Sequence, residues 1–146
     1  MKPKIISINI SKEKGTKKEP IDKAYVLKDK GLMNDVHAGN WHRQVSFLAL
    51  ESIEKMRAKG LNASYGDFAE NITTLGIDLI SLPVGTKLKL GNEVEVVITQ
   101  IGKKCHLGCE IFKLTGDCVM PKEGIFAKVL KGGTISIADE IRIEEP

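Results

Sequence analysis

The chain has 146 residues, of which 42% are hydrophobic and 28% are charged, values ordinary for a globular domain. This length suits one domain with a substantial core, and we expect residues 1–146 to form a single domain. No apolar run approaches the roughly 20 residues that a membrane-spanning helix needs. Ser7, Asn9 and Ser11 interrupt the N-terminal stretch, which therefore lacks the apolar region of a signal peptide. We expect a cytoplasmic protein with no membrane partner.

The formal net charge of +3 is unevenly distributed along the chain. Residues 1–30 hold nine lysines against four acidic residues, so this stretch carries +5 and the remainder −2. The lysines spread over a predicted strand and a loop, and aromatic residues make up only 5% of the chain. A nucleic-acid partner is therefore not expected. We interpret the lysines mainly as solvated charges on a sheet edge and in loops, with a small anionic ligand as the weaker alternative.

The first predicted elements are strands. Residues 4–10 alternate, with Ile6, Ile8 and Ile10 on one face, which is typical of a half-buried strand. A polar loop follows, and residues 21–28 predict a second strand that forms a hairpin with the first.

About twenty residues without sustained periodicity, 27–46, come next. A loop of this length in a compact domain is usually functional or mobile. It contains His37, Trp41, His42 and Arg43. A single loop histidine is more often a surface residue than a ligand, but the two histidines together with Asp35 and Trp41 favour the wall of a pocket.

The middle of the chain predicts a strand at 45–50, a helix at 51–59 that ends before Gly60, and a strand at 68–74. The last of these carries Glu70 and Asn71. Polar groups in an apolar strand are costly unless they are paired or exposed in a cleft. Either the pair lies on a solvent-facing side of the strand, or it lines a site.

Two hairpins are predicted in the second half, at 86–98 and 134–143, with a short helix at 125–130 between them. Seven or eight short alternating strands with two or three short helices predict a mainly β protein. We expect a closed or nearly closed β-barrel with mostly antiparallel pairing.

All three cysteines lie in residues 102–121, which read GKKCHLGCEIFKLTGDCVMP. Lys103 and Lys104 precede Cys105, and His106 follows it. Nearby positive charge favours the thiolate, which is the nucleophilic and metal-binding form of cysteine. Gly102 allows close approach of the backbone to a ligand. An odd number of cysteines favours free thiols over a disulfide framework.

Less specific interpretations of these cysteines remain open. Cys118 is best explained as a small core residue, and Cys109 lies off the apolar stripe of a predicted helix at 107–114. Cys105 would then lie at or before the start of that helix, where the helix dipole favours thiolate. A structural zinc site normally needs a second ligand pair, which the spacing here does not supply.

The sequence resembles MOSC domains, named for the C-terminal domain of molybdenum-cofactor sulfurase. Matching stretches occur in order along nearly the whole chain: LMNDVHAG at 32–39, GDFAENITT at 66–74, LPVGTKLKLG at 82–91, VITQIG at 97–102 and KCHLGC at 104–109. The match is to the short, stand-alone kind of MOSC domain. Relatives often have Pro or Ser before the central cysteine, whereas Lys104 stands there in this chain.

The resemblance implies a β-rich barrel that acts in molybdenum-cofactor metabolism or sulfur transfer, with Cys105 as its chemical centre. Cys105 would carry sulfur as a persulfide received from a pyridoxal-phosphate-dependent cysteine desulfurase, or would ligate molybdenum. Cofactor-biosynthesis or acceptor proteins are the other expected partners, and pyridoxal phosphate is expected only in the desulfurase. The alternatives are a non-enzymatic module that binds or delivers the pterin cofactor, molybdopterin, and a structural zinc protein.

The remaining candidate residues take supporting roles in this hypothesis. Lys103, Lys104 and His106 would stabilise the thiolate or contact a pterin phosphate. Gly102 would allow the ligand to approach the backbone. The cleft would be lined by His37, Glu70 and Asn71.

Overall fold

The computed structural model describes residues 2–14, 16–102 and 123–144, and these form two β-sheets with one α-helix and one 3-10 helix. The larger sheet contains β1 (Lys4–Ile10), β2 (Glu19–Ile21), β5 (Val45–Ala49), β6 (Ile72–Leu75), β7 (Lys87–Leu90), β8 (Val94–Ile101), β9 (Ile125–Lys131) and β11 (Ile141–Ile143). The smaller sheet contains β3 (Lys23–Leu27), β4 (Gly31–Leu32) and β10 (Gly133–Ser136). Helix α1 spans Leu50–Ala58 and the 3-10 helix η1 spans Leu79–Ser81.

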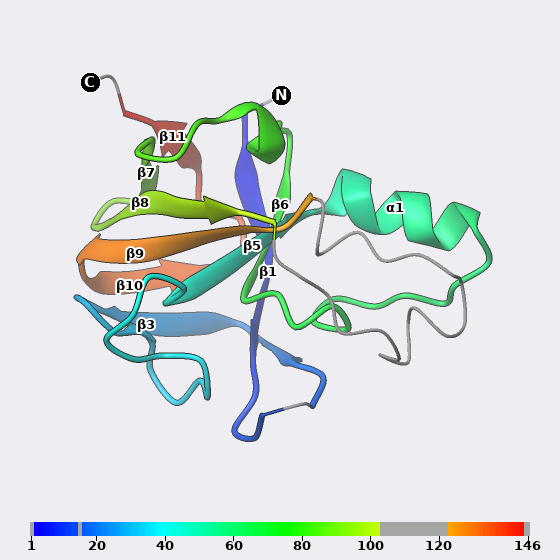
Figure 1. Ribbon diagram of the computed structural model, residues 1–146, viewed down its shortest axis with the longest axis horizontal. Coiled ribbons are helices and arrows are strands. Elements are labelled where there is room, and N and C mark those ends of the chain that lie inside the picture. The colour runs from blue at the N-terminus through cyan, green and yellow to red at the C-terminus, as the bar shows by residue number, and fades with distance from the viewer. Residues whose placement is uncertain (1, 15, 103–122, 145–146) are drawn as a thin grey trace.

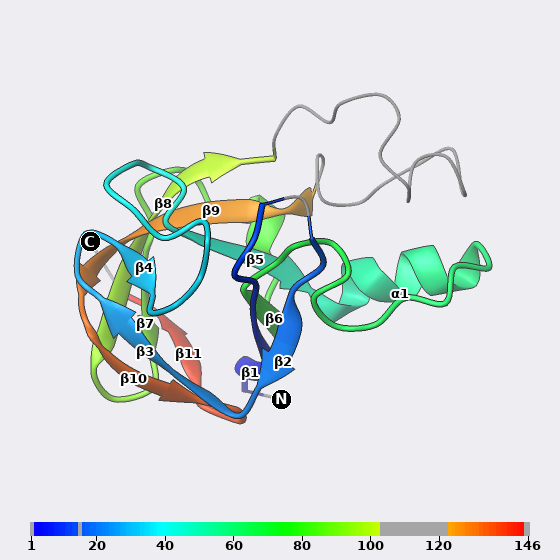
Figure 2. The ribbon, with the colours of Figure 1, turned by 90° about the horizontal axis from the view of Figure 1, so that it is seen from below.

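The strand order in the larger sheet is β11-β7-β8-β9-β5-β6-β1-β2, and in the smaller sheet it is β10-β3-β4. The protein is mainly β, as predicted, and every strand pair is antiparallel except β5 with β6. Parallel neighbours need a crossover connection, and α1 lies in the one that joins β5 to β6. Helix α1 and the smaller sheet lie towards opposite ends of the molecule, as Figure 1 and Figure 2 show.

The expected closed barrel is not supported, because both sheets are open. The end strands β11 and β2 of the larger sheet do not pair with each other. The residues that precede β11 contact β1 through the bridge between Lys4 and Glu140 and through backbone hydrogen bonds of Ile5 with Ala138 and Asp139, but β11 and β1 are not paired strands. Strands β3 and β10 pair with each other in the smaller sheet and not with strands of the larger one. Within the described residues the strands therefore form two separate open sheets and no closed barrel.

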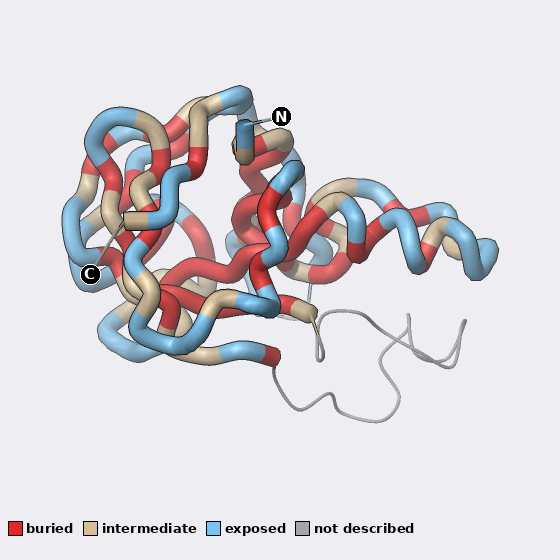
Figure 3. The backbone as a smooth tube through the Cα atoms, turned by 90° about the horizontal axis from the view of Figure 1, so that it is seen from above, coloured by how far each residue is buried: buried red, intermediate tan, exposed pale blue. Residues whose placement is uncertain are grey.

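Two apolar clusters explain the burial pattern of the strands. The main core fills the space between the sheets, and Val26, Leu32 and Ile135 of the smaller sheet pack into it. A second cluster lies under α1 and includes Leu48 and Phe126. Strand β5 contacts both clusters, and all of its residues are buried. Figure 3 shows how the buried residues concentrate in the central strands.

Several local predictions are confirmed. The hairpin at 86–98 is β7 and β8, and the helix at 51–59 is α1 shifted by one residue. The first strand is β1, although its buried positions differ from those expected. A register shift between Ile5 and Ser7 turns Ile5 into the core and buries Ser7.

Other local predictions are wrong. Residues 125–130 form the strand β9 rather than a helix, and in the stretch 68–74 only Ile72 and the residues after it are strand. The C-terminal hairpin does not form, because β10 pairs with β3 and β11 pairs with β7. The second strand is divided into β2, which does pair with β1, and β3, which belongs to the smaller sheet. The helix predicted at 107–114 lies outside the described residues.

Candidate functional site

The residues that flank the cysteine segment are joined where β8 ends and β9 begins, in the interior of the larger sheet. The Gly102 amide, after β8, donates a hydrogen bond of 2.7 Å to the Gly124 carbonyl, before β9. Gly102 has a φ of 70°, in the left-handed region that glycine adopts readily. Lys103, Lys104, Cys105 and His106 lie outside the described residues, as do Cys109 and Cys118. The chain therefore leaves the sheet towards Cys105 and returns to it at one point.

The loop between β4 and β5 is attached to the same end of β8. The Gln100 side-chain amide donates to the Gly102 carbonyl at 2.7 Å, and its Oε1 lies 2.8 Å from His42 Nε2. Since Oε1 can only accept, His42 Nε2 is the donor in this contact. The Thr99 hydroxyl also donates to the His42 carbonyl. His42 is thereby placed beside the start of the cysteine segment.

Arg43 and Trp41 form a cation–aromatic group beside this strand end. The Arg43 guanidinium carbon lies 4.6 Å from the centroid of the Trp41 ring and 5.5 Å from that of Phe126. Arg43 Nε is buried and has no hydrogen-bond partner among the residues that the structure describes. Trp41 remains 37% exposed. A guanidinium beside an exposed aromatic side chain suits an anionic ligand that contains a planar ring.

His37 is held by a buried ion pair. Lys18 Nζ lies 2.7 Å from Asp35 Oδ1, and both side chains are fully buried. The same ammonium group lies 2.9 Å from His37 Nδ1 and donates to the Ser11 hydroxyl at 3.2 Å. Asp35 Oδ2 accepts from the His37 amide at 3.2 Å, and the His37 carbonyl accepts from Trp41 Nε1 at 2.8 Å. Lys18 is therefore an exception to the interpretation of the N-terminal lysines as mainly solvated charges.

Glu70 is fully buried in the turn that precedes β6. Its carboxylate accepts hydrogen bonds from the Phe68 amide at 3.2 Å and the Thr73 hydroxyl at 3.0 Å. Burial raises the pKa of the Glu70 carboxyl above its usual value, and these hydrogen bonds oppose that shift without cancelling it.

Asn71 is 1% exposed and connects three strands. Its Oδ1 accepts from the Ser46 amide at 3.0 Å at the start of β5, and its Nδ2 donates to the Asn9 carbonyl of β1 at 3.2 Å. Glu70 and Asn71 are thus neighbours inside the protein, and their described contacts hold strands and turns in place.

The structure joins some of the residues singled out from the sequence. A chain of contacts runs from His37 through Trp41 and His42 to Gln100 and Gly102. Glu70 and Asn71 connect to β1 through Asn9, because the Asn9 side chain donates to the Glu70 carbonyl at 3.2 Å. Both groups therefore meet near the end of β1, where Ser11 donates its amide to Asp35.

Lys18, Arg43 and Gln100 were not selected as site residues from the sequence. Nothing local distinguishes Lys18 from its neighbour Lys17, whose side chain is 61% exposed. Arg43 could have been selected, since an arginine beside the only tryptophan of the chain is a recognisable cation–aromatic pattern.

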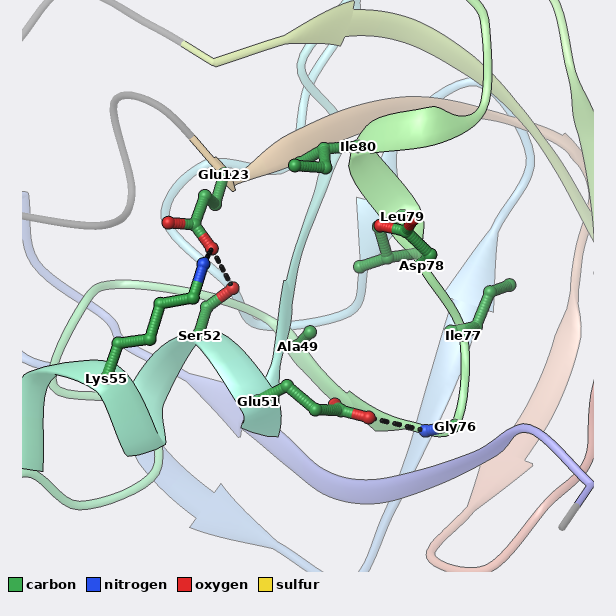
Figure 4. Close-up of a pocket in the computed structure, with 10 residues that line it drawn as sticks. All are labelled: Ala49, Glu51, Ser52, Lys55, Gly76, Ile77, Asp78, Leu79, Ile80 and Glu123. Atoms are coloured by element: carbon green, nitrogen blue, oxygen red, sulfur yellow. Dashed lines mark hydrogen bonds and ion pairs between the residues drawn. The ribbon is translucent and has the colours of Figure 1, made fainter. Parts of the chain in front are cut away.

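A cavity of about 450 Å³ opens beside the first turn of α1 (Figure 4). Its lining includes Glu51, Asp78 and Glu123. Glu123 accepts from Ser52 at 2.7 Å and from Lys55 at 2.9 Å, while Glu51 accepts from the Gly76 amide at 3.1 Å. Two of the three carboxylates are thus engaged by protein groups. Within the described ranges, no three His, Cys, Asp or Glu side chains are grouped as metal ligands, and no helix is long and apolar enough to cross a membrane.

Comparison with solved structures places this fold among known proteins. The YuaD protein from Bacillus subtilis superimposes with a TM-score of 0.80 at 19% identity, over 97% of this chain and 94% of that one. YiiM from Geobacillus stearothermophilus gives a TM-score of 0.71 at 20% identity, over 98% and 75% of the two chains. YiiM from Escherichia coli gives 0.69 at 16% identity, over 100% and 71%. At these identities the similarity concerns the fold.

A search of curated protein sequences finds no significant match. The MOSC domain family matches residues 34–142, which is most of the chain and includes His37, Gly102 and Cys105. The chain therefore belongs to the MOSC domain family.

Proposed function

We propose that this protein acts in molybdenum-cofactor metabolism and that Cys105 carries sulfur as a persulfide for sulfuration of the cofactor. The match of the MOSC domain family to residues 34–142 carries this proposal, because that family is linked to molybdenum-cofactor sulfurase. The hydrogen bond between Gly102 and Gly124 supports it, since it ties the ends of the Cys105 segment beside the Trp41–His42–Arg43 cluster.

Sulfur transfer to Cys105 needs a thiolate and a donor persulfide. The Cys105 thiolate attacks the outer sulfur of a persulfide on a cysteine desulfurase, and a new sulfur–sulfur bond forms at Cys105. The sulfur–sulfur bond of the donor breaks, and its electron pair leaves with the donor cysteine as thiolate. Lys103, Lys104 and His106 favour the attacking form of Cys105 by their positive charge or hydrogen bonding.

In this proposal the substrate of the protein is molybdopterin, which carries a planar ring system and a phosphate. The exposed Trp41 side chain and the neighbouring Arg43 guanidinium fit such a group. Gly102 leaves room for close approach to the backbone. The His37 ring would line the binding site. Glu70 and Asn71 would shape the site indirectly, because they hold β1, β5 and the turn before β6 in place.

The test loads the purified protein with sulfur from a cysteine desulfurase and L-cysteine, and measures its intact mass. We expect a gain of one sulfur atom that dithiothreitol removes, and loss of this adduct in Cys105→Ser. Cys118→Ser is the matched control and should keep the adduct. An adduct that persists in folded Cys105→Ser would overturn Cys105 as the sulfur carrier.

A second candidate function is pterin binding or delivery without sulfur chemistry, with Cys105 as a molybdenum ligand. The Arg43–Trp41 pair favours it, because this pair needs only an anionic ring-bearing ligand. Bound molybdenum and pterin, measured in protein from a molybdate-replete host, should then fall in Arg43→Gln without any sulfur adduct in the wild type. One zinc per chain, lost together with folding in Cys105→Ser, would contradict both functions.

A further inference from the structure

A β-bulge near the end of β8 brings two consecutive side chains to the same residue of the loop between β4 and β5. The register between β8 and β9 shifts between Ile98 and Gln100, so Thr99 is the extra residue of the bulge. In a regular strand, consecutive side chains point to opposite faces of the sheet. Here the Thr99 hydroxyl donates to the His42 carbonyl, and the Gln100 side chain contacts the His42 ring. Bulges re-aim side chains and are over-represented next to active sites.

The two ends of the Gln100 side-chain amide contact two different segments of the chain. The Gly102 carbonyl can only accept, so the amide nitrogen must be the end that lies 2.7 Å from it. The amide oxygen therefore faces His42 Nε2 at 2.8 Å, and that ring nitrogen carries a hydrogen. A protonated imidazole also donates from Nε2, so this contact does not depend on the charge of the ring. We call these two hydrogen bonds the Gln100 link.

Gly102 is held at both of its backbone polar groups. Its amide donates to the Gly124 carbonyl at 2.7 Å, and its carbonyl accepts from the Gln100 link. The orientation of a carbonyl fixes the direction in which the chain continues, because the peptide group is planar. Cys105 follows Gly102 by three residues, and three residues span at most about 11 Å. The direction set at Gly102 therefore limits where the Cys105 thiol can be presented.

We infer that Gln100 is a positioning residue, which ties the start of the cysteine segment to His42 and thereby orients Cys105 for sulfur transfer from a protein donor. The inference rests on the proposed function for the identity of the reaction. Gln100 makes and breaks no covalent bond, since a neutral amide is neither a nucleophile nor a base at neutral pH. His42 acts through Gln100 by holding its amide oxygen, and Cys105 supplies the nucleophile. Fixing the geometry of reacting groups in this way accelerates a reaction between two molecules.

The first experiment observes the Gln100 link directly by NMR. Gln44 and Gln100 are the two glutamines of the sequence, so ¹⁵N-glutamine labelling gives two side-chain NH₂ groups, and the one lost in Gln100→Glu is assigned to Gln100. We expect slow hydrogen exchange at the Gln100 NH₂ and faster exchange in His42→Phe, which lacks the donor to the amide oxygen. His42→Gln retains a donor and should restore slow exchange. Exchange in the wild type as fast as in free glutamine overturns the inference.

The second experiment compares two reactions of Cys105. Gln100→Glu and Gln100→Met both remove the donor to Gly102, the first with a carboxylate of similar shape and the second without a charge. Sulfur loading by a cysteine desulfurase needs a defined approach, so its rate should fall by about tenfold or more in both variants. Alkylation by iodoacetamide follows the thiolate fraction and needs no fixed approach, so in Gln100→Met its rate should change by less than about threefold.

The control for the introduced charge is Asn92→Asp, an exposed amide-to-carboxylate change in the turn before β8. It should alter neither reaction. Unchanged sulfur loading in folded Gln100→Met overturns the positioning role, and so does an equal slowing of both reactions. Gln100 is only partly buried, so its variants are expected to fold. If they do not, the NH₂ exchange rates in the wild type and in His42→Phe decide the question.

A double-mutant cycle tests whether His42 acts through Gln100. His42→Phe should slow sulfur loading by itself, whereas adding it to Gln100→Met should cause no further loss. Additive losses overturn the role of His42 in the link. If the wild type takes up no sulfur, the proposed function fails, and hydrogen exchange at the Gly102 amide decides the positioning role independently. That amide should exchange faster in Gln100→Met than in the wild type, and equal rates overturn the inference.

Discussion

Ser46 and Asn71 exchange four hydrogen bonds across the start of the parallel β5–β6 pair. Asn71 Oδ1 accepts from the Ser46 amide at 3.0 Å and from the Ser46 hydroxyl at 3.2 Å. In return, the Asn71 amide is shared between the Ser46 hydroxyl at 2.9 Å and the Ser46 carbonyl at 3.0 Å. Parallel pairs begin without a tight turn to set their register, so this side-chain clamp defines where β5 and β6 start.

Asn71→Ala should destabilise the protein by about 2–5 kcal/mol, because it leaves the buried Ser46 amide and Asn9 carbonyl without their side-chain partner. Urea unfolding followed by circular dichroism measures this free energy. The exposed Asn62→Ala is the control and should change it by less than about 0.5 kcal/mol. Similar values for the two variants would show that the clamp does not contribute to stability.

Glu70 should make stability depend on pH. Burial raises the pKa of its carboxyl in the folded protein, so the folded state holds the proton more tightly than the unfolded state does. Its contribution is fully present below the unfolded-state pKa and is lost as the pH rises through the higher folded-state pKa.

Glu70→Gln should remove that dependence, so it should gain stability relative to the wild type as the pH is raised from about 4 to 8. Unfolding free energies at several pH values test this, with the exposed Glu13→Gln as the control. A wild-type stability that rises relative to Glu70→Gln over this range would contradict the direction of the pKa shift.

Gly66 should tolerate no side chain. Its φ is 89°, and a Cβ added there would lie 2.0 Å from the Lys18 carbonyl oxygen. Gly60 has a similar φ of 94° but nothing within 4 Å of an added Cβ. Gly60→Ala should therefore cost only the backbone strain of about 1–2 kcal/mol, whereas Gly66→Ala should also displace the Lys18 loop.

Thermal unfolding should accordingly show a clearly larger loss of stability for Gly66→Ala than for Gly60→Ala. The ¹H–¹⁵N correlation spectrum of the His37 side chain should also change in Gly66→Ala but not in Gly60→Ala, because Lys18, which contacts His37, would move. Equal losses of stability would mean that the loop adapts without cost.

Cys105 should be the most reactive thiol. Lys103, Lys104 and His106 lie within two positions of it, whereas Glu110 follows Cys109 and Asp117 precedes Cys118. Iodoacetamide labelling at pH 7, followed by peptide mass spectrometry, should modify Cys105 several-fold faster than the other two. Replacing both preceding lysines with alanine should slow this reaction. Preferential labelling of Cys118 would contradict the assignment of the low-pKa thiol.

The sequence alone determined the features that depend on neighbouring residues. Alternation with a tight turn predicted the β7–β8 hairpin, and a short apolar stripe ending at Gly60 predicted α1. The loop containing His37 and Trp41 was recognised by its lack of periodicity, and ordered matches along the chain identified the family. Each of these signals is contained in one stretch or in the order of several stretches.

Tertiary structure decided which distant segments became neighbours. In the stretch 125–130, Ile125, Ala127 and Val129 lie in the main core and Phe126 lies in the cluster under α1. A short run with apolar residues on both faces has no periodicity with which to distinguish strand from helix. Strand β10 pairs with β3, over a hundred residues away, rather than with the adjacent β11, so the sheets stay open. Lys18 is buried while Lys17 is exposed, because Asp35 and Ser11 approach from other parts of the chain to satisfy its charge. The cost of burying an ammonium group depends on partners that only the fold supplies.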